Sequence, residues 1–383
     1  MHGADTGQVA DQQIGVPYVL MRGGTSKAVF VRGSDLPPPG ADRDALILGL
    51  FGSPDPRQID GLGGADLLTS KLAIIDGPSR ADADLDYTFG QVSINDPVVD
   101  YDINCGNISA AVGAFGVDEG FVPAAGGTVR VRIHNTNTGK ILVAEVPTVG
   151  GRAAIAGDVA IDGVPGTGAA IALDYSATAG GSTGSLLPTG NPTDQLDVEG
   201  RAVPVTILDI ANLCVFFDAR AVGLVGTEGP AEFTERHLES ISQIKAATAA
   251  LLGMSDDGLT PIPVAVAPPA AFVSFATGDK VGQDEIDLLA RVVGGRPPVL
   301  HKAYPGTVGA TTAVAAAIPG TVVNAVSRPG QEGRLRIGHP SGTMPVRGLI
   351  RETPDGVVVD QAAYVRTARR LAEGTAFVMR ATD

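Results

Sequence analysis

Two stretches dominated by small residues constrain the fold of this 383-residue chain more than any other feature. The first reads Cys-Gly-Asn-Ile-Ser-Ala-Ala-Val-Gly-Ala-Phe-Gly over residues 105–116, and the second reads Gly-Ala-Thr-Thr-Ala-Val-Ala-Ala-Ala-Ile-Pro-Gly over residues 309–320. Gly, Ala, Ser and Thr on every side of a helix allow other backbones to approach it closely. Each stretch therefore predicts a helix enclosed by its own sheet.

The segments that follow the two stretches also match. Residues 129–133 read Val-Arg-Val-Arg-Ile, residues 335–337 read Leu-Arg-Ile, and Cys105 lies as far from Arg132 as Gly309 lies from Arg336. Each half predicts a small-residue helix, a turn and an alternating strand that leads into a polar hairpin. The match predicts two pseudo-repeated α+β domains, although similarity in a chain with 51 glycines can also arise by chance.

The length of the chain also favours two domains. The loop-rich stretch 177–195 is the expected junction, which divides the chain into domains 1–185 and 186–383. Apolar periodicity predicts strands at residues 17–22, 71–75, 87–94, 140–146 and 203–208, and surface helices at residues 42–50, 233–252, 283–293 and 361–373. The uncharged run 303–327 contains prolines and predicts a buried helix with flanking loops rather than a membrane span.

Composition limits the classes of function. The net charge of −14 argues against nucleic acid or an anionic membrane as a partner. The five histidines show no ligand spacing and the two cysteines are too few for a zinc site, so neither a metal nor a disulfide framework is expected. The first residues lack a cationic start and an apolar stretch, which favours a cytoplasmic enzyme. The expected partners are a small anionic substrate and, in a homodimer, a second copy of the chain.

Cys105 stands where the first small-residue helix is expected to begin, with Asn104 as its cap. The start of a helix carries unpaired N–H groups and a partial positive charge, which favour a thiolate and bind a carboxylate oxygen. A free cysteine among small residues can instead be a core residue. The position of Cys105 favours chemistry, and the N–H groups of Gly106 and Asn107 are candidate anion ligands.

Lys71 follows a glycine-rich loop, Asp-Gly-Leu-Gly-Gly-Ala-Asp-Leu-Leu-Thr-Ser at residues 60–70, and begins a predicted strand. Such a loop offers N–H groups to an anion, and a desolvated lysine beside it supplies charge or a base. The spacing matches neither a dinucleotide-binding loop nor a P-loop. An exposed surface lysine is the alternative, but the four apolar residues after Lys71 favour burial of its aliphatic part.

Two further loops, Arg-Gly-Gly-Thr-Ser-Lys at residues 22–27 and His-Pro-Ser-Gly at residues 339–342, offer hydroxyls and glycine N–H groups to carboxylates, although each is also an ordinary turn. In the repeat, Gly309 takes the place of Cys105, so the second helix start has no thiol. A racemase with two thiol bases would need both. A lone thiol needs another partner, and Lys71 is the best-placed candidate, which fits proton removal at one carbon and return at another.

The chain resembles the 2-methylaconitate cis–trans isomerases and their relatives, 3-methylitaconate delta-isomerase and 4-oxalomesaconate tautomerase. The resemblance is carried by Leu-Met-Arg-Gly-Gly-Thr-Ser-Lys (20–27), Leu-Thr-Ser-Lys (68–71), Asn-Cys-Gly-Asn-Ile-Ser (104–109), Leu-Leu-Pro-Thr-Gly-Asn (186–191) and His-Pro-Ser-Gly (339–342). These segments follow one another through nearly the whole chain. One departure is Ala28, where the family commonly has glycine.

The resemblance implies the diaminopimelate-epimerase-like fold, in which each of two domains curls a sheet around a central helix. It implies a cofactor-independent isomerase that moves an allylic proton in an unsaturated di- or tricarboxylate such as 2-methylaconitate or aconitate. The alternatives are a 4-oxalomesaconate keto–enol tautomerase and a non-catalytic accessory protein of an aconitase-like dehydratase. The family lysine and cysteine fall on Lys71 and Cys105. The implied substrate contacts are Arg22, Gly23, Gly24, Thr25, Ser26, Ser70, Gly106, Asn107, Arg291, His301, Thr307, Ser341 and Gly342.

Overall fold

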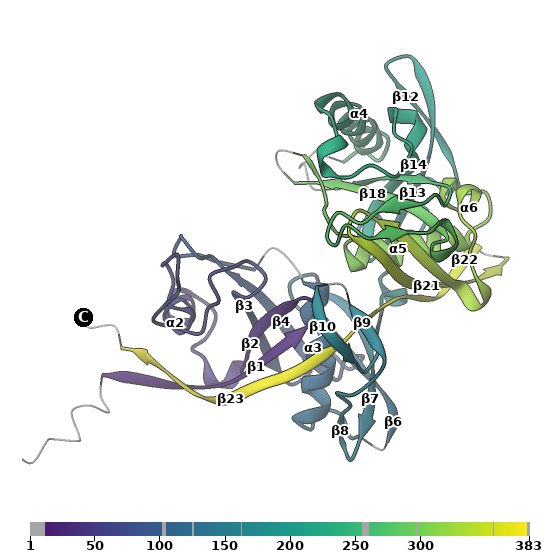
Figure 1. The fold of residues 1–383 in the computed structure, drawn as a ribbon. Coiled ribbons are helices and arrows are strands. Elements are labelled where there is room, and N and C mark those ends of the chain that lie inside the picture. Colours follow the sequence, from purple (N-terminus) through teal and green to yellow (C-terminus); the bar gives the residue numbers. More distant parts are fainter. Residues whose placement is uncertain are drawn as a thin grey trace, which may run out of the picture. The chain divides into compact units, whose positions relative to one another are not determined.

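The computed structural model describes residues 12–101, 105–124, 126–161, 163–254, 260–295, 298–354 and 356–380. They form two compact units (Figure 1). Unit 1 holds the described residues up to Leu173 and those from Arg366 onward, and unit 2 holds those from Asp174 to Val365. This division differs from the predicted domains 1–185 and 186–383, because the last strand of the chain pairs with the first.

The elements of unit 1 are β1 (Gln13–Gly23), β2 (Ser26–Arg32), α2 (Ala41–Phe51), β3 (Lys71–Asp76), β4 (Leu85–Val92), β5 (Val99–Asp100), α3 (Gly106–Asp118), β6 (Gly127–Asn135), β7 (Lys140–Val149), β8 (Arg152–Ala153), β9 (Val159–Ile161), β10 (Val164–Gly168) and β23 (Ala368–Met379). Strand β11 (Ile171–Asp174) ends at the boundary between the units.

The elements of unit 2 are β12 (Asp194–Val198), β13 (Arg201–Ile210), β14 (Asn212–Asp218), α4 (Glu235–Leu251), β15 (Ile262–Ala267), β16 (Phe272–Val273), β17 (Lys280–Val281), β18 (Leu288–Gly294), β19 (Val299–Leu300), α5 (Gly306–Ala317), α6 (Val322–Val326), β20 (Arg334–His339), β21 (Gly342–Thr353) and β22 (Gly356–Arg366). Among the described residues, none of the helices is both long and apolar enough to cross a membrane.

The sheet of unit 1 separates two layers. Strands β23, β1, β2, β3, β4, β6 and β7 are neighbours in that order, with parallel pairing at β2–β3 and β4–β6. Side chains alternate between the two faces of a strand. Val29 and Leu72 join the apolar core that α2 covers. Phe30 points the other way, and its ring lies 5.3 Å from that of Phe115 on α3.

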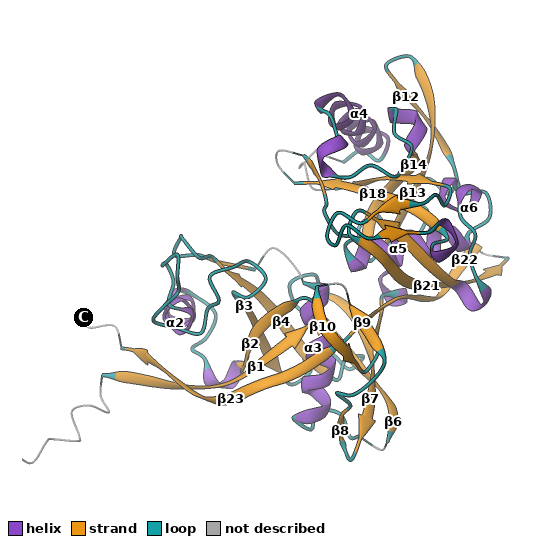
Figure 2. Cartoon of the chain, in the orientation of Figure 1, coloured by secondary structure: helices purple, strands orange, loops and turns teal. Residues whose placement is uncertain are grey.

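Both small-residue helices are enclosed as predicted (Figure 2). Residues Ile108–Val117 of α3 and Val308–Ala316 of α5 are all buried. A Cβ on Gly113 would lie 2.5 Å from the Cβ of Ala144 on β7, so a glycine is needed for this close approach. Each unit thus has the sheet curled around a central helix that defines the diaminopimelate-epimerase-like α+β fold.

The repeat is clearest at an arginine–aspartate pair. In unit 1 the backbone N–H and the Nη2 of Arg132 donate to the carboxylate of Asp84, at 2.7 and 2.6 Å. In unit 2 the same two groups of Arg336 donate to Asp287, at 2.7 and 2.8 Å. Each ion pair links two neighbouring parallel strands, β4 with β6 in unit 1 and β18 with β20 in unit 2. The predicted equivalence of Arg132 and Arg336 is therefore confirmed.

The predicted equivalence of Gly309 and Cys105 is wrong. Helix α3 is preceded by Cys105 as its N-cap, and α5 is preceded by Pro305. Gly309 lies one turn later, where its N–H donates to the carbonyl of Pro305 at 2.9 Å. The position equivalent to Cys105 is thus Pro305, and the second helix start still has no thiol.

The predicted strands all coincide with or overlap β1, β3, β4, β7 and β13, and the helices at 42–50 and 233–252 match α2 and α4. The helices predicted at 283–293 and 361–373 are wrong. The first is β18 with a short 3-10 turn before it, and the second is divided between β22 and β23. Strand β18 is buried on both faces, so its apolar run has no alternation and looks like a helix in sequence.

Candidate active site

Lys71 is the first residue of β3, and the sheet directs it toward α3. It pairs with Ala28 of β2 on one side and with Gln91 of β4 on the other. Residues paired across strands point to the same face, and Phe30, two positions after Ala28, contacts α3. Lys71 therefore lies on the face that encloses α3.

The contacts of Lys71 hold its side chain in place. Only 7% of Lys71 is exposed, as the apolar residues after it led us to expect. Its Nζ donates to Oε1 of Gln91 at 2.6 Å and lies 5.2 Å from the centroid of the Phe89 ring. A buried amine with one directed acceptor is suited to act on a bound ligand rather than on solvent.

Cys105 is the N-cap residue of α3 rather than part of its first turn as predicted, and its side chain makes no capping hydrogen bond. It is half-buried, and its Sγ lies 4.0 Å from Oγ of Ser26. Asn104, the predicted cap, lies outside the described residues. The thiol therefore lies where the free N–H groups of the helix start also lie.

Ser26 connects the two candidate residues. It lies two positions before Ala28 on β2, so both side chains share a face, and Ala28 pairs with Lys71. Gly23 pairs with Ser26, and a Cβ on Gly23 would collide with the backbone of α3. The structure thus places Lys71 and Cys105, the predicted acid–base pair, on the α3 side of the sheet in unit 1, with Ser26 near the thiol.

Asn107 holds the loop that precedes β2. Its Nδ2 donates to Oγ1 of Thr25 at 3.1 Å, and its Oδ1 accepts from Nε of Arg366 at 2.9 Å. Gly24 has a φ of +50° and approaches the Asn107 amide so closely that a Cβ would lie 2.3 Å from Oδ1. The side chain of Asn107, predicted as a substrate contact, is therefore occupied in positioning this loop, while its backbone N–H lies at the helix start.

Arg22, another predicted contact, points away from α3. It precedes Gly23, whose face is toward the helix, so its own side chain leaves from the opposite face. The guanidinium Nη1 donates to the carbonyls of Gly24 at 2.9 Å and Thr367 at 3.0 Å. Burial and the nearby Arg369 lower the pKa of Arg22. The structure gives Arg22 the role of tying β1 to the last segment of the chain.

The glycine-rich loop is organised by a glutamine that the sequence did not indicate. Gln58 is 2% exposed, and its Oε1 accepts from Oγ of Ser70 at 2.6 Å and from the N–H of Ala65 at 2.8 Å. Its Nε2 donates to Oγ of Ser53 at 2.8 Å. Ser70, a predicted substrate contact, is buried and donates to Gln58, so it supports the loop that leads into Lys71.

The predicted contacts in the second half gather in unit 2. Thr307 is half-buried in the first turn of α5. Ser341 donates its hydroxyl to the carbonyl of Lys302, and the exposed His301 has its Nδ1 2.9 Å from the carbonyl oxygen of Ala303. The loop before α5 therefore contacts the hairpin between β20 and β21, but the hydroxyl of Ser341 is already used.

The same hairpin carries His339 and Gly342. Gly342 begins β21 and pairs with His339, whose ring stacks at 6.3 Å on that of Tyr304. The N–H of Ser341 donates to Nδ1 of His339 at 3.2 Å. His339 thereby orders the turn that leads into Gly342.

Arg291 lies on β18 and is buried. It is 1% exposed, and its Nε donates to the carbonyl of Glu228 at 2.7 Å while Nη1 donates to those of Ala290 and Gly338 at 2.9 and 3.2 Å. Phe272, 5.5 Å below the guanidinium, belongs to the core that α4 covers. Burial lowers the pKa of Arg291 to about 10. Nε and Nη1 thus serve the structure, whereas Nη2 is buried without a hydrogen-bond partner among the described residues.

The other cysteine is not a second site. Cys214 is 0% exposed, and burial raises the pKa of its thiol. Among the described residues, no group of three or more His, Cys, Asp or Glu side chains could hold a metal ion.

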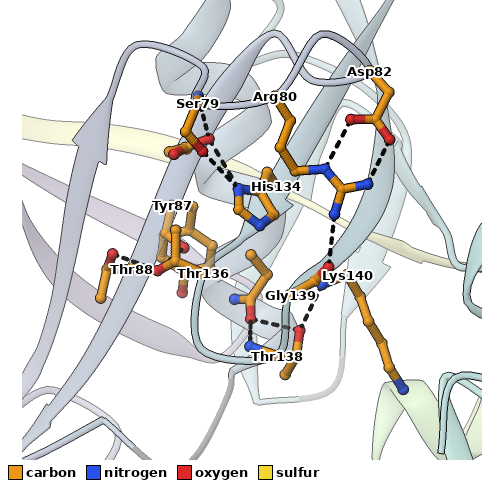
Figure 3. Close-up of polar contacts among 12 residues, drawn as sticks. Ser79, Arg80, Asp82, Tyr87, Thr88, His134, Thr136, Thr138, Gly139 and Lys140 are labelled. Atoms are coloured by element: carbon orange, nitrogen blue, oxygen red, sulfur yellow. Dashed lines mark hydrogen bonds and ion pairs between the residues drawn. The ribbon is translucent and has the colours of Figure 1, made fainter.

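Ser79, in the turn between β3 and β4, meets Asp86 of β4 and His134 of β6, with Ser79 and His134 drawn in Figure 3. The Oγ of Ser79 and the Oδ1 of Asp86 lie 3.4 and 3.0 Å from the same ring nitrogen, Nδ1 of His134. A nucleophile relay needs the hydroxyl and the carboxylate on different ring nitrogens. This cluster is therefore a polar contact between strands and not a hydrolase triad.

The fold and the local geometry together describe a diaminopimelate-epimerase-like protein, and comparison with known proteins identifies its family. Residues 13–379 match the family described as PrpF protein. The chain is 48% identical to 3-methylitaconate isomerase of Eubacterium barkeri, covering 96% of this chain and 98% of that protein. It is 40% identical to 2-methyl-aconitate isomerase of Shewanella oneidensis, covering 94% and 96%.

A solved structure gives the same result. The crystal structure of methylitaconate-delta-isomerase superimposes with a TM-score of 0.90 at 48% identity, covering 96% of each chain. The chain belongs to the PrpF family and is an isomerase.

Proposed function

We propose that this protein moves an allylic proton within a small unsaturated di- or tricarboxylate, with Lys71 and Cys105 as its acid–base pair and without a cofactor. The observation that carries the proposal is the placement of both residues on the α3 face of unit 1, Cys105 near Ser26 and Lys71 opposite Ala28, two positions further along β2. Two proton-transfer groups from distant parts of the sequence, one at a helix start and one buried on a strand, are suited to two different carbons of one substrate.

In the proposed reaction, one of the two groups removes a proton from a carbon next to the double bond, which leaves a dienolate. The other group returns a proton at the far end of the dienolate, so the double bond moves and the atoms balance. Proton exchange between the pair, or with solvent, then restores it. The helix-start N–H group of Gly106 and the loop Gly23–Ser26 stabilise the carboxylate on which the charge develops.

The relatives guide the choice of substrate. The relative named 3-methylitaconate isomerase is 48% identical, whereas those named for 2-methyl-aconitate and (4E)-oxalomesaconate are about 40% identical. A branched dicarboxylate such as methylitaconate is therefore the first compound to test, followed by 2-methylaconitate and aconitate.

Proton NMR in deuterated buffer tests the proposal on these three compounds and on 4-oxalomesaconate. The wild-type protein is expected to convert at least one compound and to introduce deuterium at both allylic carbons. Lys71→Ala and Cys105→Ala are each expected to lower kcat by about 10²- to 10⁴-fold, because each removes a proton-transfer group. Lys280→Ala, at an exposed lysine of β17, is the matched control and is expected to behave like the wild type.

Four outcomes would decide against the proposal or against one of its parts. Near-normal deuterium exchange by Lys71→Ala would remove the role given to Lys71, and the same result for Cys105→Ala would remove that of the thiol. Conversion of 4-oxalomesaconate alone would support the tautomerase alternative. No conversion of any compound would favour a non-catalytic accessory protein.

A further inference from the structure

We infer that Gln91 is a positioning residue for Lys71, and that it acts as an uncharged acceptor whose direction is fixed by the glycine-rich loop. The inference rests on the proposed function, which gives Lys71 its role in proton transfer. Gln91 is 9% exposed and lies directly opposite Lys71 in the pairing of β3 with β4.

The orientation of the Gln91 amide follows from its donors. Its Nε2 donates to the carbonyls of Ser70 at 2.9 Å and Leu67 at 3.2 Å, which uses both N–H bonds. A flipped amide would direct Oε1 at these two carbonyl oxygens and an N–H at Nζ of Lys71. All three contacts would then be unfavourable. The acceptor Oε1 must therefore face Lys71, at the observed 2.6 Å.

Nζ of Lys71 also lies near the aromatic ring of Phe89, a residue of β4 whose backbone is held by Asn137. The backbone N–H of Phe89 donates to Oδ1 of Asn137, and its carbonyl accepts from Nδ2, both at 2.8 Å. The ring centroid lies 5.2 Å from Nζ of Lys71. Strand β4 thus supplies both the acceptor and the ring near Nζ, and the Gln91 amide links them to the loop 60–70.

The absence of charge on Gln91 matters for an anionic substrate. A carboxylate at this position would oppose the positive charge of a protonated Lys71, which a polycarboxylate and its dienolate need nearby. It would also lose both donors to the loop. Glutamine gives Nζ a direction and leaves its charge available to the ligand.

Two substitutions distinguish loss of the acceptor that orients Nζ of Lys71 from addition of a negative charge at position 91. Gln91→Met keeps the volume but removes the acceptor, and it is expected to lower kcat by about 10- to 100-fold with KM changed by less than about threefold. Gln91→Glu keeps an acceptor but adds a charge, and it is expected to raise KM by about tenfold. If Gln91→Met does not fold, Gln91→Asn withdraws the same amide by one methylene and is assessed in the same way.

A second readout does not depend on the reaction. Acetic anhydride labelling of Lys71, measured by peptide mass spectrometry against the exposed Lys280, is expected to rise at least about threefold in Gln91→Met, because Nζ is no longer held. Gln58→Met is the matched control, since Gln58 anchors the same loop through Ser70 without contacting Nζ. It is expected to lower the melting temperature and to leave Lys71 labelling unchanged.

The two readouts separate failure of this inference from failure of the proposed function. A wild-type protein that converts no substrate would refute the function, while labelling would still report on how Nζ is held. Wild-type kcat or wild-type labelling in a folded Gln91→Met protein would overturn the positioning role. An equal rise in labelling in Gln58→Met would also overturn it, because the effect would then come from a loosened loop.

Discussion

Replacement of Gly23 by alanine tests whether the close approach of β1 to α3 holds the site together. A Cβ at this position would lie 2.3 Å from the carbonyl oxygen of Asn107 and 3.0 Å from the Cβ of Ala111. The nearer contact is with backbone, which cannot rotate away. Strand β1 and the start of α3 would therefore have to separate by most of an ångström.

The structure gives the expected size of the effect. Overpacking of this kind costs about 1–3 kcal/mol. In a unit of this size each kcal/mol changes the melting temperature by roughly 2–4 °C, so Gly23→Ala is expected to lower it by about 2–12 °C. Because the separation also moves Cys105 relative to Ser26 and Lys71, kcat is expected to fall by about 10- to 100-fold.

Thermal unfolding by circular dichroism and the NMR assay measure these two effects. Gly77→Ala is the control, because a Cβ on Gly77 meets nothing within 4 Å and its φ lies outside the left-handed region. Its melting temperature should remain within about 1 °C of the wild type. If Gly23→Ala also melted within about 1 °C of the wild type and kept its kcat, the close approach of β1 to α3 would not be what positions the site.

Three further predictions test other parts of the structure. Iodoacetamide is expected to alkylate Cys105 and to spare Cys214, because burial shields the Cys214 thiol and raises its pKa; equal modification of both in peptide mass spectrometry would contradict this. Burial opposes ionisation of Glu119, but hydrogen bonds from two arginines outweigh it and hold its pKa below the ordinary 4.5. The stability that the ionised Glu119 contributes is present above pH 4.5 and is lost as pH falls through its lower folded-state pKa. In Glu119→Gln the melting temperature should therefore fall less steeply with acid than in the wild type. An unchanged slope would contradict this prediction. Arg291→Lys is expected to lower the melting temperature by roughly 5 °C, because a lysine cannot donate to all the carbonyls that the guanidinium joins. Its KM should change by less than about threefold. A large rise in KM without a change in melting temperature would show that Arg291 contacts the substrate.

The sequence predicted features that depend on local pattern. The small-residue composition of α3 and α5 is a direct consequence of their enclosure, because a larger side chain at Gly113 would meet β7. Lys71 was predicted to be buried from the apolar residues after it, and it is 7% exposed. Such features depend on neighbouring residues in the sequence, so the sequence is enough to predict them.

The sequence could not predict features that depend on pairing between distant strands. The return of β23 to β1 changes the domain boundary, and nothing near residues 368–379 indicates it. The strand β18 carries a continuous apolar run that fits a helix equally well. The bonds of Arg22 and Asn107 also come from distant segments, so their side chains were expected to be available for a ligand.

The glutamines illustrate the same limit at the site. Gln91 is a polar residue on the inward face of an apolar strand, which is a signal that the sequence does contain. Its partner, however, is identified only by the register that places it opposite Lys71. Gln58 lies in a loop and carries no comparable signal.

The repeat allows unit 2 to be compared with unit 1 position by position. Strands β4 and β18 each begin directly after the aspartate that binds the equivalent arginine, so Gly294 corresponds to Gln91. Strands β3 and β15 are their antiparallel partners, and they begin with Lys71 and Ile262 respectively. Unit 2 therefore has neither the lysine nor the glutamine that orients it.

The helix starts complete this comparison. Cys105 is the N-cap of α3, and Pro305 is the N-cap of α5, so the third member of the polar set is also missing from unit 2. Both units retain an enclosed helix whose first N–H groups are free of helical partners, and such groups bind carboxylates. Two equivalent bases, one in each unit, would invert the configuration at a single carbon. Within unit 1, the proposed pair consists of two different groups, a lysine and a thiol, which fits the allylic proton shift proposed above better than inversion at one carbon.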